Sequence, residues 1–393
     1  MIAPGTLRPR ALYLHVPFCE RLCPYCDFAV HLGGAGLHPR YVDAMALELD
    51  TLAETGADPA GAPLTTVFIG GGTPSLLAPE LLERLLERVR AGFGIAPGAE
   101  VTIEANPSGI TSEAAVRWLA AGVTRVSLGV QSLDDDVLRQ LGRSHDAATA
   151  VAAVERLRQA GVRHLSCDLI YAVPGRPAAT FARSLERLLT LNPEHVSCYE
   201  LTVETGTRLH RQVVRGLVRP PAAAAALRQH WWAVDRLEAA GLAQYEVSNF
   251  ARPGEQSRHN RVYWRGGTYW GVGAGAHGHL AVPLARRLGM PVAPGAAAVR
   301  CWNQRSTPRY LAQVEREGQG RAGWEGVQAE QRRLERWLLG LRRREGVRLS
   351  TVHARAEAPQ LAAAQLVTLD RERVRVTRRG AEVLDQIALR LAG

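Results

Sequence analysis

Short apolar runs alternate with longer amphipathic stretches along the first half of the chain. Each run is six to eight residues long and rich in Val, Ile and Leu, which is typical of strands covered on both faces. The predicted strands cover residues 11–16, 65–70, 100–105, 123–130, 164–170 and 195–201. The predicted helices cover residues 39–54, 79–91, 111–120, 134–160 with a break near Gly142, and 177–190. Six such repeats predict a parallel sheet rolled into a barrel or part of one.

The pattern is less regular in the second half. A helix is predicted at 221–240, and the segment 281–299 is predicted to be a loop because it is rich in Pro, Ala and Gly. Near the C-terminus, helices are predicted at 328–344 and 380–392, and a hairpin strand is predicted between them at 371–377. Helices followed by a small hairpin resemble a winged-helix module.

These patterns predict an α/β protein with three regions. Residues 1–210 form a partial (β/α)6 barrel, 211–320 an irregular extension, and 321–393 a smaller α+β region with the winged-helix-like module. The length of 393 residues suits a barrel with an appendage. Residues 1–10 lack the pattern of a signal peptide, and no apolar run reaches the roughly 18 residues of a membrane span, so we expect a cytoplasmic, reducing location.

Polar residues and glycines gather at the carboxyl ends of the predicted strands, where parallel barrels carry their chemistry. In chain order, the six strand ends lead into Cys19, glycines 70–72, Glu104, Gln131, Asp168 and Tyr199. Packing alone does not account for such residues at all six ends. We therefore expect a functional site at this rim.

Three cysteines, Cys19, Cys23 and Cys26, follow the first strand at spacings of four and three residues. Thiolates are soft ligands, and three of them on a short loop can hold three corners of a cuboidal iron–sulfur cluster. The fourth iron would stay open, and we expect S-adenosylmethionine to bind there. The spacing leaves two alternatives open, a zinc site completed by His31 and a structural disulfide. The other cysteines are predicted to be thiols without a ligand role: Cys167, Cys198 and Cys301.

The other rim residues offer the groups that such a cofactor needs. Glu104 and Asp168 supply carboxylates for ribose hydroxyls, and Gln131 supplies an amide. Arg143 supplies a guanidinium for a carboxylate. The glycine run at 70–72 either lets backbone approach a ligand closely or forms a tight turn between strand and helix. Each residue alone has a structural explanation, but together at strand ends they favour a cofactor.

Charge and composition narrow the chemistry. The net charge is +10, but all 48 basic residues are arginine and none is lysine, which we attribute to compositional bias. Because pyridoxal phosphate needs a lysine Schiff base, pyridoxal-dependent radical enzymes are excluded. Residues 321–393 carry 15 arginines against 9 acidic residues, so a nucleic-acid-binding regulator is one alternative function.

A second candidate site is the element His259-Asn-Arg-Val-Tyr263-Trp264 in the extension. His259 can donate to a haem iron, while Tyr263 and Trp264 offer flat apolar faces to a macrocycle. The alternative is a packed loop with a hydrogen-bonded histidine. His277 and His279 are further candidates of the same kind.

The motifs around these residues resemble the radical S-adenosylmethionine superfamily, and within it the oxygen-independent coproporphyrinogen III oxidase-like branch. The resemblance covers Tyr13 to about Gly278. It rests on Tyr-Leu-His-Val-Pro-Phe-Cys from Tyr13, Cys-Pro-Tyr-Cys-Asp-Phe ending at Phe28, Phe-Ile-Gly-Gly-Gly-Thr-Pro-Ser from Phe68, Gly-Val-Gln-Ser ending at Ser132, and Asp-Leu-Ile-Tyr-Ala-Val-Pro-Gly from Asp168. True decarboxylases of this branch have another cysteine where this chain has Phe28. That difference, together with the element at 259–264, resembles the HemW group of haem chaperones.

The resemblance implies a partial barrel of the radical SAM type that holds a [4Fe-4S] cluster and S-adenosylmethionine, and it implies haem as a further ligand. The implied cluster ligands are Cys19, Cys23 and Cys26. The implied S-adenosylmethionine contacts are Tyr13, Tyr25, Gly71, Gly72, Thr73, Glu104, Gln131, Arg143 and Asp168, together with Thr202 and His277.

Three functions follow, in decreasing order of support. The first is a haem chaperone that delivers haem to respiratory haem proteins. The second is an oxygen-independent coproporphyrinogen III oxidase, a radical oxidative decarboxylase and thus an oxidoreductase of porphyrin metabolism; whether the chain is an enzyme stays open between these two. The third is the nucleic-acid-binding regulator. The first function allows a membrane-associated acceptor and a homodimer, and it gives no reason to expect nucleic acid as a partner.

Overall fold

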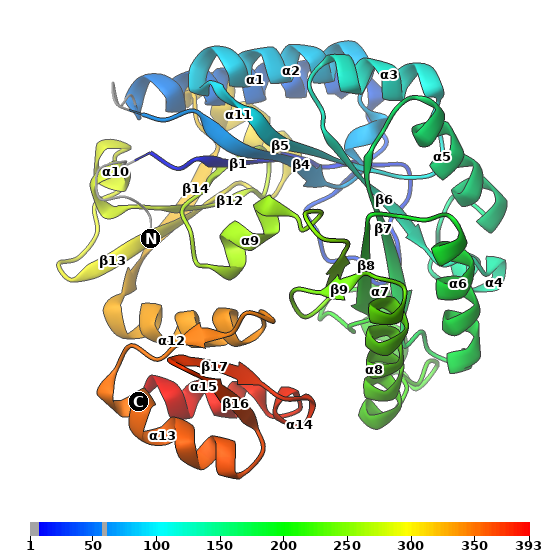
Figure 1. The fold of residues 1–393 in the computed structure, drawn as a ribbon. Helices are drawn as coiled ribbons and strands as arrows, with labels where there is room; N and C mark the ends of the chain where they lie inside the picture. Colours follow the sequence, from blue (N-terminus) through cyan, green and yellow to red (C-terminus); the bar gives the residue numbers. More distant parts are fainter. Residues whose placement is uncertain (1–7, 57–60) are drawn as a thin grey trace.

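The computed structural model describes residues 8–56 and 61–393, and a large curved sheet dominates it (Figure 1). Residues 1–7 and 57–60 lie outside the described part, and they include most of the stretch used above for the signal-peptide expectation. Within the described part, no helix is both long and apolar enough to cross a bilayer.

The sheet has nine strands in the order β11-β1-β4-β5-β6-β7-β8-β10-β9. Its six central strands are all parallel, and they are β1 (Ala11–Val16), β4 (Leu64–Gly71), β5 (Ile95–Ala105), β6 (Arg125–Gln131), β7 (His164–Tyr171) and β8 (His195–Glu200). The edges are β11 (Trp270–Val272), parallel to β1, and the antiparallel pair β10 (Asn249–Ala251) and β9 (Ala243–Gln244). Among the described residues the two edge strands do not pair, so the predicted partial barrel is confirmed as an open one.

Helices cover the convex face of this sheet, as Figure 1 shows. They are α1 (His38–Thr55), α2 (Pro79–Phe93), α3 (Ser112–Ala120), α4 (Asp135–Gln140), α5 (Ala147–Gln159), α6 (Ala178–Thr190) and α8 (Ala223–Ala239). In α2 the buried side chains recur at three- and four-residue spacing, which gives the helix one apolar face toward the strands. The predicted break near Gly142 is confirmed, because α4 ends just before it and Gly142 takes a φ of 69° that favours glycine.

The extension is more ordered than its sequence predicts. It contains α7 (Arg208–Val214), α9 (Arg258–Trp264), α10 (Val282–Arg287) and α11 (Thr307–Glu317), with β12 (His277–Leu280) and β13 (Ala296–Asn303). The prediction of a loop over 281–299 is wrong, because α10 and the start of β13 lie there. The alanines at the start of β13 pair with β14 (Arg321–Gln328), and the rest of β13 also pairs with β12, so non-local pairing overrides weak local preference.

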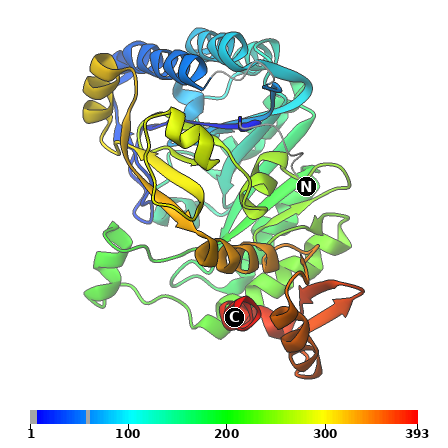
Figure 2. The ribbon, with the colours of Figure 1, turned by 90° about the vertical axis from the view of Figure 1, so that its left-hand side faces the viewer.

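The C-terminal module has its own apolar core, which includes Trp337, Leu361, Val374 and Leu391. It consists of α12 (Ala329–Leu341), β15 (Val347–Arg348), α13 (Val352–Ala363), β16 (Val367–Asp370), β17 (Arg373–Val376), α14 (Arg378–Ala381) and α15 (Leu384–Ala392). Helices around a three-stranded antiparallel sheet form the expected winged-helix-like arrangement. Figure 2 shows this module at the opposite end of the molecule from α1 and α2. The division at 210 and 320 stays a prediction, and the pairing of β13 with β14 runs across the second boundary.

Helix α9 lies on the concave side of the sheet (Figure 1). The carboxylate of Glu100 on β5 accepts hydrogen bonds from the backbone N–H groups of Arg258 and His259, at 2.8 and 2.9 Å. A carboxylate at the positive end of a helix satisfies amides that lack a partner within the helix. These contacts fix α9 inside the curve of the sheet, below the rim where the strands end.

Candidate functional site

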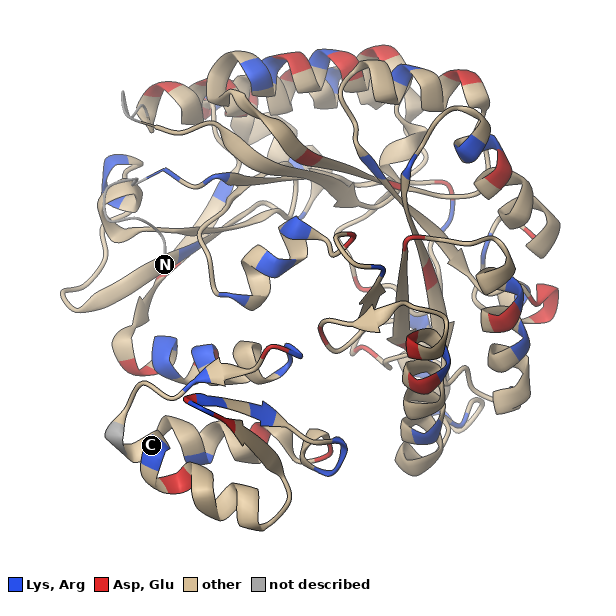
Figure 3. Ribbon diagram, in the orientation of Figure 1, with Lys and Arg blue, Asp and Glu red and all other residues tan. Residues whose placement is uncertain are grey.

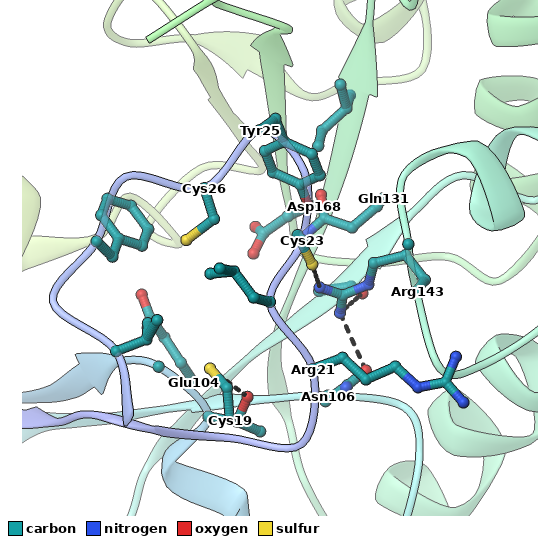
Figure 4. A pocket seen from close by; sticks show the side chains of 18 of the residues that line it. Cys19, Arg21, Cys23, Tyr25, Cys26, Glu104, Asn106, Gln131, Arg143 and Asp168 are labelled. Atoms are coloured by element: carbon teal, nitrogen blue, oxygen red, sulfur yellow. Dashed lines mark hydrogen bonds between the residues drawn. The ribbon is translucent and has the colours of Figure 1, made fainter. Parts of the chain in front are cut away.

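A cavity of about 460 Å³ opens at the carboxyl ends of the parallel strands. Figure 4 shows side chains that point into it from the cysteine loop and from β5, β6 and β7, among them Glu104, Gln131 and Asp168. The site residues predicted from the sequence that line it are Cys19, Cys23, Tyr25, Cys26, Gly71, Gly72, Thr73, Glu104, Gln131, Arg143, Asp168 and Thr202. Residues separated by up to about half of the chain therefore meet here because parallel strands end at the same edge of a sheet.

The two ends of the cysteine loop are joined by a short strand pair, and a turn hydrogen bond lies within it. Strand β2 (Phe18–Cys19) pairs with β3 (His31–Leu32), and the N–H of Cys26 donates to the carbonyl of Cys23 at 3.1 Å. All three thiols are free and face the cavity. Burial raises the pKa of Cys19, and it raises that of Cys26 to about 11, so binding to metal must release their protons.

The three thiols are not placed to share a single metal ion. Among residues 8–56 and 61–393, no three His, Cys, Asp or Glu side chains are placed to hold one metal ion. In a cuboidal cluster each thiolate binds a different iron, so the sulfurs stay apart. The zinc alternative with His31 therefore finds no support in the geometry, and a disulfide finds none because the three cysteines are free.

The glycine run brings the end of β4 against the cysteine loop. The N–H groups of Gly72 and Thr73 donate to the carbonyls of Val16 and Phe18, each at 2.8 Å. A side chain at Gly72 would meet the backbone of Pro17 and Phe18 at 2.7 Å. The glycine run therefore serves both purposes considered above. It makes the close backbone contact that needs glycine, and this contact places the cavity wall beside Cys19.

Two carboxyl groups of the cavity wall have raised pKa values. Burial raises the pKa of Glu104 to about 7, against the opposing effect of a 2.9 Å hydrogen bond from the N–H of Gly71. Burial also raises the pKa of Asp168, although Ser127 and Ser166 donate hydrogen bonds to it. A ligand that brings hydroxyl or ammonium donors to these carboxylates would offset the cost of burying them.

At this site the amide oxygen of Gln131 and Nε of Arg143 are buried and have no hydrogen-bond partner within the described part of the chain. The rest of the Arg143 guanidinium is held in place, because it donates to Asn106 and to the carbonyl of Gly129 at 3.0 and 3.1 Å. Gln131 also has a φ of 63°, which is rare for a residue with a side chain. Unpaired polar groups in a cavity wall are expected where a polar ligand completes the site.

Tyr13 and His277, predicted as S-adenosylmethionine contacts, do not line this cavity. Tyr13 lies deeper in the barrel, beside a second cavity of about 220 Å³, and its hydroxyl is 3.0 Å from Nδ1 of His15. The other ring nitrogen of His15 is 2.8 Å from the carbonyl of Ala29, so this pair supports the cysteine loop from below. His277 is exposed on β12.

The residues of the element at 259–264 lie in two different environments, one buried in the barrel and one partly exposed. His259 is fully buried, Nδ1 lies 2.9 Å from the hydroxyl of Thr66, and Nε2 lies 2.7 Å from the hydroxyl of Tyr263. Burial lowers the pKa of His259 to about 3. The prediction that His259 ligates haem is untested, but in this structure neither ring nitrogen is open to a ligand. Trp264, in contrast, is partly exposed and faces the C-terminal module.

We expect His259→Ala to lower the free energy of unfolding by about 2–4 kcal/mol, because it leaves a cavity and two hydroxyls without a partner. Chemical denaturation of the purified variant measures this. His277→Ala is the matched control and should change stability little, since its side chain is exposed. A variant with unchanged stability but weakened haem binding would instead restore His259 as a haem ligand.

Several cavity residues were not singled out from the sequence as site residues. Asn106 accepts from Arg143, is hydrogen-bonded to the ring of His145, and lines the cavity with Ser127. Asn106 directly follows Glu104 and Ala105 at a strand end, so its position in the sequence was a usable signal. The role of Ser127 could not be read in advance, because it depends on which side of β6 faces Asp168.

Comparisons with known proteins agree with this arrangement. The radical SAM superfamily profile matches residues 13–188. The chain is 38% identical to the heme chaperone HemW of Mycobacterium tuberculosis, over 100% of this chain and 97% of that protein. It is 39% identical to the heme chaperone HemW of Escherichia coli, over 72% of this chain and 73% of that protein.

The fold is also that of a solved structure. Coproporphyrinogen III oxidase (HemN) from Escherichia coli, described as a radical SAM enzyme, superposes with a TM-score of 0.80. The match covers 99% of this chain and 91% of that one at 22% identity, which shows a shared fold and leaves the activity open. Because a curated relative is 38% identical over the whole chain, and because the cysteine loop and the strand-end residues meet in one cavity, this chain belongs to the HemW family of the radical SAM superfamily.

Proposed function

We propose that this protein is a haem chaperone, which binds haem and delivers it to respiratory haem proteins in the cytoplasm or at a membrane. The observation that carries the proposal is the relation to the heme chaperone HemW over 97% of that protein's length. The absence of a thiol at Phe28 supports it, since Phe28 is 65% exposed at the mouth of the cavity, where decarboxylases of the branch have a cysteine.

We also propose that the cavity holds a [4Fe-4S] cluster and S-adenosylmethionine. Cys19, Cys23 and Cys26 would hold the cluster, which when bound supplies one-electron reduction of the sulfonium. The guanidinium of Arg143 suits the carboxylate of S-adenosylmethionine, and Glu104 and Asp168 suit its ammonium and hydroxyl groups. The proposal extends to the other predicted contacts that line the cavity and leaves out Tyr13 and His277, which do not.

The deciding experiment is a comparison of haem binding and decarboxylation by the same anaerobic preparation. We expect the protein to bind added haem stoichiometrically and to release no carbon dioxide from coproporphyrinogen in the presence of S-adenosylmethionine and a reductant. Absorption in the Soret region reports the first and labelled carbon dioxide the second. Decarboxylation dependent on S-adenosylmethionine would instead assign the second function, which the likeness of fold to HemN keeps in view.

The nucleic-acid-binding alternative receives less support from the charge distribution. In Figure 3 acidic and basic residues are interspersed over the C-terminal module. Many of its arginines form ion pairs with acidic residues, among them Arg342 with Asp385, Arg348 and Arg355 with Glu372, and Arg375 with Asp370. A face that attracts phosphates needs arginines without such partners.

A further inference from the structure

A second and larger cleft, of about 950 Å³, lies between the barrel and the C-terminal module. Its walls come from α8, α9, the turn at 244–247, the end of α12, β17 and the last helices. Its volume lies at the upper end of the roughly 300–1,000 Å³ that small-molecule sites occupy. It is separate from the cavity that the cysteines face, with which it shares no lining residue.

The two walls of the cleft are held together by specific contacts. Arg378 of the module forms an ion pair with Asp235 of α8, and its guanidinium lies 4.9 Å from the ring centre of Trp231. The N–H of Arg344 donates to the carbonyl of Tyr245 at 3.0 Å. These contacts hold the C-terminal module against the barrel, so the cleft between them has defined walls.

At one end of this cleft, arginine side chains outnumber the carboxylate with which they pair. Arg261 of α9, Arg265 and Arg343 all pair with a single carboxylate, that of Glu345. Burial, with the other arginines nearby, lowers the pKa of Arg343. Nε of Arg343 and Nε of Arg375 are buried and have no hydrogen-bond partner in residues 8–56 and 61–393. Figure 3 shows basic residues on α9, α12 and the module hairpin around this region. Three guanidinium groups around one carboxylate suit a ligand that brings further carboxylates.

The remaining lining offers flat apolar faces and one imidazole. Trp231, Trp264 and Tyr245 border the cleft together with His230 of α8. Nδ1 of His230 lies 3.4 Å from the hydroxyl of Tyr171, and Nε2 has no hydrogen-bond partner among the described residues. Burial and Arg378 lower the pKa of His230, so its ring is neutral at pH 7, the form that binds iron.

We propose that haem binds in this cleft, with His230 as iron ligand, the tryptophans against the porphyrin faces, and Arg261 and Arg343 paired with its two propionates. This inference rests on the proposed function, which supplies the cargo. It also accounts for the element at 259–264. His259 and Tyr263 anchor α9 inside the barrel, while Arg261 and Trp264, on the other side of the same helix, line the haem site.

The test is a titration of the full-length, cluster-loaded protein with hemin, followed in the Soret region. His230→Ala should shift the Soret maximum and weaken hemin binding by about tenfold or more, as expected when an iron ligand is lost. His210→Ala is the matched control, because His210 is a partly exposed helical histidine of α7 outside the cleft. Arg261→Glu should weaken the binding of hemin but not that of its dimethyl ester, which lacks the carboxylates.

The possible outcomes distinguish a failure of the cleft assignment from a failure of the proposed function. If the unmodified protein does not bind hemin, the proposed function itself fails. If it binds hemin but His230→Ala and Arg261→Glu keep both the affinity and the Soret maximum, haem binds elsewhere and only the cleft assignment fails. Should His230→Ala not fold, as circular dichroism would show, Arg261→Glu decides the matter alone, because Arg261 is partly exposed on α9 and its variant should fold.

Discussion

Replacing Cys19, Cys23 or Cys26 by alanine is expected to remove the cluster almost completely. Anaerobically prepared protein should carry about four irons and four sulfides per chain, and each single variant should carry close to none. The physical reason is that a thiolate is the only bond that each of three irons has to the protein. Burial raises the pKa of Cys19 and Cys26, so their deprotonation has to be driven by the bonds to metal.

The cysteines outside the cavity provide the control for this prediction. Cys167 and Cys198 are buried in β7 and β8, and Cys301 lies on β13 against Gly278. Replacing all three by alanine should leave iron and sulfide unchanged, while stability falls by about one to two kcal/mol for each buried site. Iron and sulfide analysis measures both sets, with the visible absorption typical of iron–sulfur proteins as a check. A cluster that survives in Cys23→Ala, or disappears in the control, would contradict the assigned ligands.

Glu48→Leu is expected to cause a large loss of stability at a position away from the cavity. Glu48 of α1 is 2% exposed, and its carboxylate accepts four hydrogen bonds. The donors are Gly273 N–H at 3.0 Å, Asn303 Nδ2 at 2.8 Å, the Tyr310 hydroxyl at 2.7 Å and Gly320 N–H at 3.1 Å. Leucine removes the acceptor of all four donors, and of these only Asn303 Nδ2 keeps another one among the described residues, the carbonyl of Gly273 at 3.0 Å. We therefore expect the free energy of unfolding to fall by about 3–5 kcal/mol.

Urea denaturation measures this change, and Glu54→Leu on the same helix is the control. Glu54 is exposed, so its replacement should change stability by no more than about 0.5 kcal/mol. Burial raises the pKa of Glu48 despite its four hydrogen bonds. A raised folded pKa stabilises the folded state at acid pH, and this contribution is lost as pH rises through the folded pKa. The part of the pH dependence that Glu48 contributes should therefore disappear in Glu48→Leu. Equal stability of the Glu48→Leu and Glu54→Leu variants would contradict the prediction that the hydrogen bonds of Glu48 hold the extension against the barrel.

Much of the fold and the rim of the cavity could be predicted because their signals are local. Six apolar runs with helical spacing between them determine six parallel strands and their helices, and parallel strands bring their ends together. Glu104, Gln131 and Asp168 could therefore be assigned to one site although 64 positions separate the first from the last. The spacing of Cys19, Cys23 and Cys26 likewise carries its chemistry within eight residues.

The parts that could not be predicted depend on partners distant in the chain. Strand β13 exists because β12 and β14 supply its hydrogen bonds, and its alanine-rich sequence alone suggests a loop. The burial of His259 depends on Thr66 of β4 and Glu100 of β5, which no spacing within 259–264 reveals.

The sequence by itself determined the six parallel strands of the half-barrel, the cysteine loop and the family. Only the tertiary structure decided which side of α9 is buried, that β11 extends the sheet beside β1, and that the C-terminal module closes a cleft against α8 and α9. The physical reason is that the spacing of apolar and metal-binding residues is a local property of the sequence. Burial and strand pairing between distant segments instead depend on tertiary contacts, which form only when the chain folds and which override weak local preferences.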